Sequence, residues 1–315
     1  RPHCAMLTNG SLSMVVSNSG ANVSFAGDIM LNKWKSDAVS EAYGHFIFIK
    51  DSRSDMIYSV TPSPIYGRSS YSSVTFKPDS IAFARKAGGI RTDLNITVCP
   101  DRNASIFRLL IKNTHNRAKN IVAADYFEPC LETWEENNSH PAYSDMFTET
   151  RFIKENNIIV TERIPHTEGK SKQYAAVMAV CSKAKAVYPV MSRYDFIGRN
   201  KTVTAPHFAD KDFDFDAVSK NGLFPCAALG VQLELAPGES AEVIYVIAYA
   251  ENYSDILNIT QYFTAESNSA GAFELAFEHA KILTQYKRIE AKQYKLINSV
   301  LSALYYPQAY NRTAT

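Results

Sequence analysis

Hydrophobic and polar residues alternate along most of the first 250 positions, in short runs rich in aromatic and β-branched side chains. A period of two residues is typical of β-strands that bury one face. The clearest runs span residues 45–51, 71–76, 106–113, 120–127 and 174–181, with turn-forming residues between them. Because no helical pattern interrupts this series, the sequence predicts a mainly β fold, a large antiparallel β-sandwich.

Two turns are specific enough to predict hairpins. In residues 80–98, Gly88-Gly89 supplies the positive φ values that a tight hairpin turn requires. In residues 231–250, Pro237-Gly238 combines a fixed φ with a residue that accepts the left-handed conformation. We therefore predict that the strands on either side of each turn pair with one another.

The pattern changes after Glu251, where apolar residues recur at helical spacing. Residues 253–266, 269–289 and 293–307 are predicted to form helices, and we interpret their apolar stripes as core packing. The stripes comprise Phe273, Ala276, Phe277, Ala280 and Leu283, and then Leu296, Ile297, Val300, Leu301 and Leu304. The expected organisation is a sandwich domain over residues 1–250 and a helical linker over residues 251–315 that leads into a further domain.

Composition and charge narrow the functional classes. The net charge of +1 gives no basic field, so no nucleic-acid partner is expected. No apolar run approaches the length that crosses a bilayer, so we expect no membrane segment. The five cysteines are scattered and never form a CxxC pair, which is typical of reduced thiols and predicts a cytoplasmic protein.

An acidic segment near residue 210 raises the question of a metal. Asp210, Asp212, Asp214 and Asp216 alternate along it, and carboxylates at this spacing can wrap a calcium ion. The segment lacks the central glycine and the closing glutamate of the helix-loop-helix calcium site, and its alternation also fits a half-buried strand or loop. The seven histidines show no metal-ligand spacing. We therefore expect no metal site and no cofactor.

The segment from residue 132 to residue 147, called the arm below, is aromatic and charged and shows neither regular period. Ordered irregular segments of this length are usually functional, because something other than a ladder must satisfy their backbone polar groups. Sugar rings stack on aromatic side chains, and polar side chains bind their hydroxyls. The sequence therefore indicates carbohydrate contact, and no HExxH or GxSxG motif accompanies it.

Several segments, in order along the chain, resemble glycoside hydrolase family 94 in its β-1,2-glucan branch. In "GDIMLNKWKSDAVSEAYGHFIFIKD" the family pattern is matched at Trp34, Asp37, Gly44 and Asp51, whereas Lys35 and Lys50 replace its arginines. The stretch "SHPAYSDMFTET" is similar to a family segment that begins His-Pro-Ala, and "FIGRN" keeps the arginine of a Phe-Leu-Gly-Arg motif as Arg199. The resemblance spans nearly the whole chain.

The resemblance implies a galactose-mutarotase-like super-sandwich, then linker helices, then an (α/α)6 barrel that begins beyond Thr315. In that family an aspartate of the barrel protonates the glycosidic oxygen while inorganic phosphate, the co-substrate, attacks the anomeric carbon with inversion. The implied partners are the C-terminal barrel, a β-glucooligosaccharide and a second copy in a homodimer, in the bacterial cytoplasm. No catalytic residue is expected in this chain.

By the same resemblance, the arm corresponds to a loop that crosses a dimer interface and helps to wall the neighbouring active site. The candidate substrate-binding residues are therefore Trp134, His140, Tyr143 and Phe147 of the arm, with Arg199, Trp34 and Asp37 from the matched motifs. The alternative is a loop that only packs against the barrel of its own chain. For Asp37, a bond to Trp34 or to nearby backbone is the simpler interpretation.

The function favoured at this point is the non-catalytic N-terminal domain of an inverting phosphorylase that acts on β-1,2-glucooligosaccharides. Two alternatives stay open. One is a stand-alone carbohydrate-binding β-sandwich module, and the other is the equivalent section of a cyclic β-1,2-glucan synthase.

Overall fold

The computed structural model describes residues 3–35, 41–52, 56–165, 169–215, 224–286 and 288–305. The strands are β1 (Cys4–Thr8), β2 (Leu12–Ser17), β3 (Asn22–Ala26), β4 (Ile29–Asn32), β5 (Phe46–Asp51), β6 (Ile57–Ser59), β7 (Tyr71–Phe76), β8 (Ile81–Ala87), β9 (Ile90–Val98), β10 (Ala104–Asn113), β11 (Lys119–Tyr126), β12 (Pro129–Glu132), β13 (Thr148–Ile153), β14 (Ile158–Arg163), β15 (Gln173–Val180), β16 (Ala186–Ser192), β17 (Pro225–Leu235) and β18 (Ser240–Ala250). The helices are α1 (Trp134–Ser139), α2 (Pro141–Asp145), α3 (Arg193–Ile197), α4 (Tyr253–Tyr262), α5 (Glu266–Tyr286) and α6 (Ala291–Tyr305), with 3-10 turns η1 (Lys154–Asn156) and η2 (His207–Ala209).

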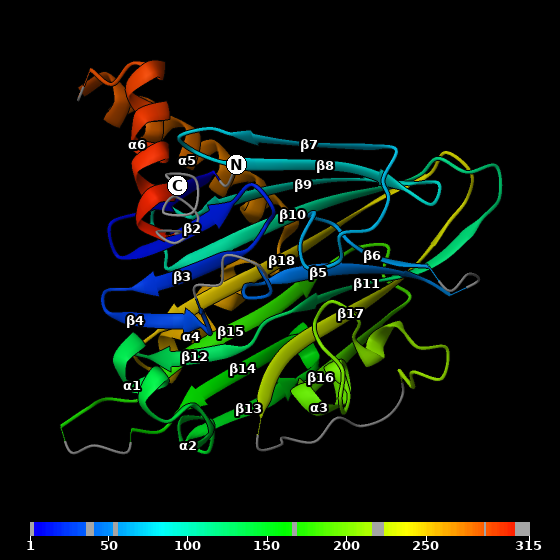
Figure 1. Ribbon diagram of the computed structural model, residues 1–315, viewed down its shortest axis with the longest axis horizontal. Helices are drawn as coiled ribbons and strands as arrows, with labels where there is room; N and C mark the ends of the chain where they lie inside the picture. Colours follow the sequence, from blue (N-terminus) through cyan, green and yellow to red (C-terminus); the bar gives the residue numbers. More distant parts are fainter. Residues whose placement is uncertain are drawn as a thin grey trace, which may run out of the picture.

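The strands form three antiparallel sheets. An eight-stranded sheet has the order β13-β14-β15-β18-β10-β9-β8-β7, and two five-stranded sheets have the orders β1-β2-β3-β4-β12 and β16-β17-β11-β5-β6. Both five-stranded sheets overlie the eight-stranded sheet (Figure 1). One buried cluster joins all three, with Leu12 of β2, Ile49 of β5 and Val243 of β18 among its members. The predicted β-sandwich followed by helices is therefore confirmed.

The two predicted hairpins have different outcomes. The first is confirmed, because β8 and β9 pair from Ile81↔Ile96 to Ala87↔Ile90 across the glycine turn. The second is wrong, because β17 and β18 belong to different sheets. The turn itself is present, with Gly238 at φ 79°. Its neighbours are held from outside: Asn113 Nδ2 donates to Leu235 O at 2.9 Å, and Asn113 O accepts from Gly238 N at 3.0 Å. The turn is closed by Glu239 N, which donates to Ala236 O at 3.0 Å, but the two strands diverge from it and enter different layers.

Helices α4 and α5 cover the outer face of the eight-stranded sheet. Ile256 and Phe263 of the α4 region and Ala272 of α5 are buried against β14, β15 and β18. Within the described ranges, no helix is both long enough and apolar enough to span a membrane.

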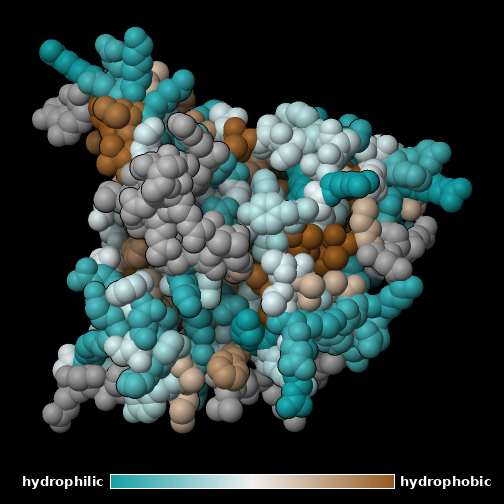
Figure 2. Space-filling model, viewed as in Figure 1, coloured by the Kyte–Doolittle hydropathy of each residue, from teal (hydrophilic) through white to brown (hydrophobic). Residues whose placement is uncertain are grey.

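The interpretation of the later apolar stripes as core packing is wrong. Ala276 is buried and Leu301 is half-buried, but six further apolar side chains of α5 and α6 are exposed. These are Phe277 (54%), Ile282 (61%), Leu283 (45%), Leu296 (64%), Ile297 (46%) and Val300 (52%), called the helical apolar face below. The side chain of Leu304 lies outside the described part. Here α5 and α6 extend past the edge of the sheets, and hydrophobic side chains gather where α6 lies (Figures 1 and 2).

Candidate functional site

The arm folds into two short helices, contrary to the irregular segment that its sequence suggested. Thr133 caps α1: its Oγ1 accepts from Glu136 N at 3.4 Å, and its own N–H donates to Glu136 Oε2 at 3.3 Å. This reciprocal capping box satisfies two backbone donors that a short helix leaves free. Pro141 then starts α2, where its fixed φ favours the first helical turn. The Thr-x-x-Glu spacing was a readable signal for α1.

A buried ion pair anchors the arm to the eight-stranded sheet. Glu132, the last residue of β12, pairs with Arg163 of β14, and these side chains are 3% and 5% exposed. The other carboxylate oxygen, Glu132 Oε1, accepts from Asn137 Nδ2 of α1 at 3.0 Å and from Ser144 Oγ of α2. Arg163 Nη1 also donates to Ser144 O at 2.9 Å. One carboxylate and one guanidinium therefore fix both arm helices.

A second ion pair ties the arm to the residue that follows β4. Lys33 Nζ lies 2.7 Å from the Asp145 carboxylate at the end of α2. Burial raises the pKa of Asp145, and the charge of Lys33 opposes that rise. The arm is thus held at both sides, which makes it a rigid wall of the cavity beside it.

That cavity, called the arm cleft, has a volume of about 730 Å³. It is lined by Lys33, Trp34, Lys35, Ala42, Tyr43, Glu128, Asn137, Asn138, Pro141, Ala142, Asp145, Arg193, Thr202, Val203, Thr204 and Phe224. Arg193 Nε donates to Glu128 Oε1 at 3.1 Å, which orients one carboxylate of the lining. An indole beside amides, hydroxyls and a carboxylate is a lining that suits a hydroxyl-rich ligand.

The structure separates the residues that the sequence nominated. Trp34 is half-buried and lines the arm cleft. Trp134 and Tyr143 are each 52% exposed on the arm, outside the cleft lining. His140 is exposed between the two arm helices, and Phe147 is half-buried with its ring centroid 5.0 Å from that of Tyr143. Asp37 lies outside the described residues.

Lys33, Glu128, Asp145 and Arg193 line the arm cleft, and sequence reasoning did not find them. They come from four separate places in the chain, after β4, after β11, at the end of α2 and at the start of α3. No local motif connects such positions, so only the fold reveals them.

Arg199 lies in a different cavity, of about 430 Å³, together with Lys201, His207 and Asp212. In the part of the chain that the structure describes, His207, Asp210 and Asp212 form the group whose spacing suits a metal ion, with ligand atoms within 4.8 Å of one another. Hydrogen bonds from Lys201 and His207 lower the pKa of Asp210. The Lys201 ammonium already pairs with that carboxylate, and Asp216 lies outside the described ranges. The absence of a metal site stays a prediction.

Comparisons with known proteins bear on the family and the fold of the chain. A family model described as the glycosyl hydrolase 94 supersandwich domain matches residues 1–266. The chain is 22% identical over 242 residues to the cyclic beta-(1,2)-glucan synthase NdvB of Rhizobium meliloti (strain 1021); this alignment covers 76% of the chain and 8% of that relative. The structure of a bacterial glucoamylase complexed with acarbose is similar in fold, with a TM-score of 0.56 at 11% identity, over 92% of this chain and 38% of that one.

Proposed function

The chain belongs to the glycosyl hydrolase 94 family, and from this membership we propose that it is the non-catalytic N-terminal domain of an inverting glycoside phosphorylase that acts on β-1,2-glucooligosaccharides. In this proposal the sandwich supports a C-terminal (α/α)6 barrel, and the arm shapes the substrate site of a homodimer in the cytoplasm. Inorganic phosphate is the co-substrate of the whole enzyme.

The observation that carries the role of the arm is its anchoring. Two ion pairs, Glu132–Arg163 and Lys33–Asp145, hold a segment that nevertheless presents Trp134 and Tyr143 to solvent. Exposed aromatic side chains on a rigid support have little conformational entropy to lose when they bind a sugar ring. A segment that served only to cover the sandwich would bury these rings rather than its polar groups.

Replacing Tyr143 with alanine in the full-length enzyme is expected to raise KM for the oligosaccharide or to lower kcat. The expected loss in kcat/KM is about two- to tenfold, because one aromatic contact contributes roughly 0.5–1.5 kcal/mol. The melting temperature should barely change, since the side chain is half exposed. His140→Ala should behave in the same way. Steady-state phosphorolysis and thermal unfolding of the same samples measure both quantities.

Tyr71→Ala is the matched control for Tyr143→Ala. Tyr71 is a 50% exposed tyrosine on β7, the edge strand of the eight-stranded sheet. The Tyr71→Ala variant should have the kinetics and the melting temperature of the parent enzyme. If Tyr143→Ala lowers the melting temperature but not kcat/KM, the arm only packs, and this part of the proposal fails.

The helical apolar face supports the proposal that a further domain follows. The exposed apolar side chains of this face form a surface of the kind that marks an interface. In the 315-residue chain alone, the double substitution Leu296→Glu/Val300→Glu is expected to reduce the binding of a hydrophobic dye and self-association. The midpoint of urea unfolding should not change. In the full-length enzyme the same variant should lower the midpoint, because the charges would then be buried against the barrel.

Leu110→Glu is the control for this surface, since Leu110 is an exposed leucine of β10 outside the helical apolar face. Leu110→Glu should change the urea midpoint by the same amount in the 315-residue chain and in the full-length enzyme. If Leu296→Glu/Val300→Glu destabilises both proteins equally, no further domain covers the helical apolar face, and the proposed barrel contact is wrong.

A second candidate is the equivalent section of a cyclic β-1,2-glucan synthase, which the similarity to NdvB favours. The two candidates differ in the reaction of the whole protein. Phosphate-dependent release of glucose 1-phosphate from β-1,2-glucooligosaccharides supports the phosphorylase, whereas phosphate-independent formation of cyclic glucan supports the synthase. Saturable glucan binding by a natural protein that ends with this domain would instead support a stand-alone binding module.

A further inference from the structure

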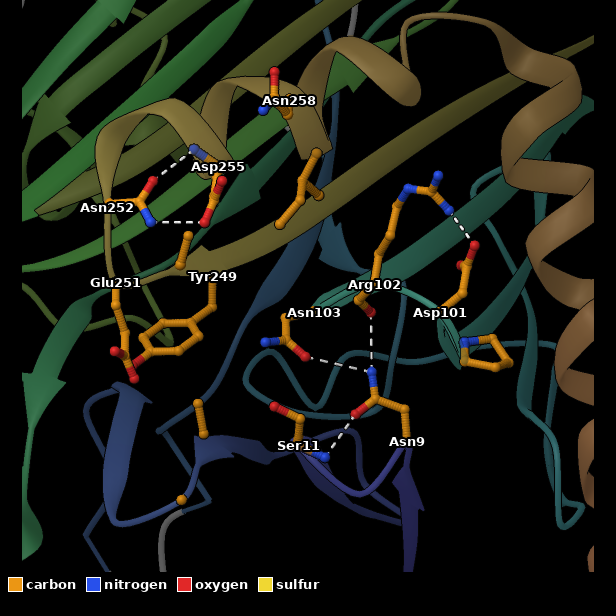
Figure 3. A pocket seen from close by; sticks show the side chains of 15 residues that line it. Asn9, Ser11, Asp101, Arg102, Asn103, Tyr249, Glu251, Asn252, Asp255 and Asn258 are labelled. Carbon is orange, nitrogen blue, oxygen red and sulfur yellow. Dashed lines mark hydrogen bonds and ion pairs between the residues drawn. The ribbon is translucent and has the colours of Figure 1, made fainter.

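A third cavity lies where four connections of the sandwich meet, and it shares no lining residue with the arm cleft. Its volume is about 690 Å³, within the range of roughly 300–1,000 Å³ typical of ligand pockets. The β1–β2, β3–β4 and β9–β10 turns and the junction between β18 and α4 surround it (Figure 3). The lining residues are Asn9, Ser11, Ala26, Gly27, Pro100, Asp101, Arg102, Asn103, Tyr249, Ala250, Glu251, Asn252, Asp255, Asn258 and Ile259.

The walls of this cavity are fixed by hydrogen bonds. Asn9 Nδ2 donates to Cys99 O at 2.9 Å and to Arg102 O at 3.0 Å, which joins the β1–β2 turn to the β9–β10 turn. Tyr249 N donates to Asn103 O at 2.9 Å, which adds the end of β18. The Asn252 side chain caps α4 by accepting from Asp255 N at 2.9 Å. A ligand would therefore meet a surface that is already in place.

Several polar groups on these walls remain available. Among the described residues, the Ser11 hydroxyl, the Glu251 carboxylate and the Asn258 amide have no hydrogen-bond partner within the protein. Figure 3 shows Ser11 at the lower wall, Glu251 at the side and Asn258 on α4 above. Glu251 and Asn258 are exposed, so they are free to bind solvent or a ligand. The available groups thus include both donors and acceptors, on separate walls.

The charge of the lining limits the class of ligand. It holds three carboxylates and one guanidinium. Arg102 is already committed, since it pairs with Asp101 and stacks its guanidinium 3.6 Å from the centroid of the Tyr262 ring. A lining with excess negative charge repels phosphates and carboxylates. In the parts of the chain that the structure describes, the group with metal-ligand spacing lies at Asp210 instead. A neutral, hydroxyl-rich molecule meets no such repulsion and can use the available donors and acceptors.

We infer that this cavity is an accessory binding site for a neutral glucan segment, separate from the arm cleft. Sugar hydroxyls donate to the Glu251 carboxylate and accept from the Asn258 amide, a pairing that neutral polyols satisfy and anions do not. The identity of the glucan as β-1,2-linked rests on the proposed function. A second site for the same polymer raises the effective concentration of chain ends near the first.

The test is titration of the 315-residue chain with short β-1,2-linked glucooligosaccharides by calorimetry and saturation-transfer NMR. Glu251→Gln and Asn258→Ala are each expected to weaken binding several-fold, and together at least tenfold, since each removes one or two hydrogen bonds to the ligand. Glu155→Gln changes an exposed glutamate in the β13–β14 connection and is the matched control. Tyr143→Ala in the arm should leave this binding unchanged.

The absence of saturable binding overturns the inference, and so does binding that survives the combined Glu251→Gln/Asn258→Ala substitution. Neither result bears on the phosphorylase assignment, which is decided by the kinetics of the full-length enzyme. Loss of binding in the combined variant, with its urea midpoint preserved and the control unaffected, supports the site. If cellooligosaccharides bind equally well, the site is still a neutral glucan site, without selectivity for linkage.

Discussion

Replacing Arg163 with alanine is expected to lower the free energy of unfolding by about 3–5 kcal/mol, the loss typical of a buried ion pair that is deprived of one partner. Arg163 and Glu132 are at most 5% exposed. The guanidinium also donates to Ser144 O at 2.9 Å and to Thr148 Oγ1 at 3.2 Å. The variant therefore keeps a buried carboxylate at the base of the arm with no cation beside it. Urea unfolding followed by intrinsic fluorescence measures the loss.

Arg108→Ala is the matched control for Arg163→Ala. Arg108 Nε lies 2.7 Å from Glu242 Oε2, but the arginine is 40% exposed, so the expected loss is about 1 kcal/mol or less. The Arg163 variant should also be cut by proteases within the arm, because both arm helices lose a shared anchor. Equal losses in the two variants, with an arm that resists proteolysis, would contradict the anchoring described here.

The strands were predictable because their signal is local. The run over 106–113 matches β10, where buried and exposed residues alternate from Leu109 to Asn113, because burial of one face imposes a period of two. The run over 71–76 matches β7, although no residue of β7 is buried. Which strand pairs with which depends on contacts between distant parts of the sequence, so it is harder to predict. Pro237-Gly238 makes the expected turn, but β17 and β18 part into two layers, and the end of β10 at Asn113 binds between them.

The candidate site was only partly predictable, for the same physical reason. The aromatic composition of the arm and the Trp34 motif could be read along the chain, and Trp34 does line the arm cleft. The pairing of Glu132 with Arg163 joins residues 31 positions apart and leaves no periodic trace. The stripes on α5 and α6 show a second limit of sequence reasoning. Helical spacing indicates an apolar face on the helix but does not indicate which part of the protein covers it.

Replacing Asp125 with alanine is expected to cost about 2–6 kcal/mol, because each buried polar group left without its partner costs roughly 1–3 kcal/mol. Asp125 has no exposed surface. Its Oδ2 lies 3.3 Å from His45 Nε2, and its Oδ1 accepts from Leu229 N at 2.5 Å. In Asp125→Ala, His45 Nε2 and the Leu229 N–H both lose their contact with the carboxylate inside the sandwich. Asp125→Asn keeps an acceptor for the Leu229 N–H and should recover most of the loss, as urea unfolding at neutral pH will measure.

The asparagine variant also reveals the protonation of this buried pair. Burial raises the pKa of Asp125, and His45 opposes that rise without reversing it. A carboxyl with a higher pKa in the folded state stabilises fully below its unfolded pKa of about 3.9, and this contribution is lost as pH rises through the folded pKa. Because asparagine does not titrate, the stability of Asp125→Asn relative to the parent should increase with pH from about 4 upward. The difference between the two proteins cancels the titrating groups that do not contact Asp125. If that difference stays constant or decreases as pH rises, Asp125 is a carboxylate in the folded protein.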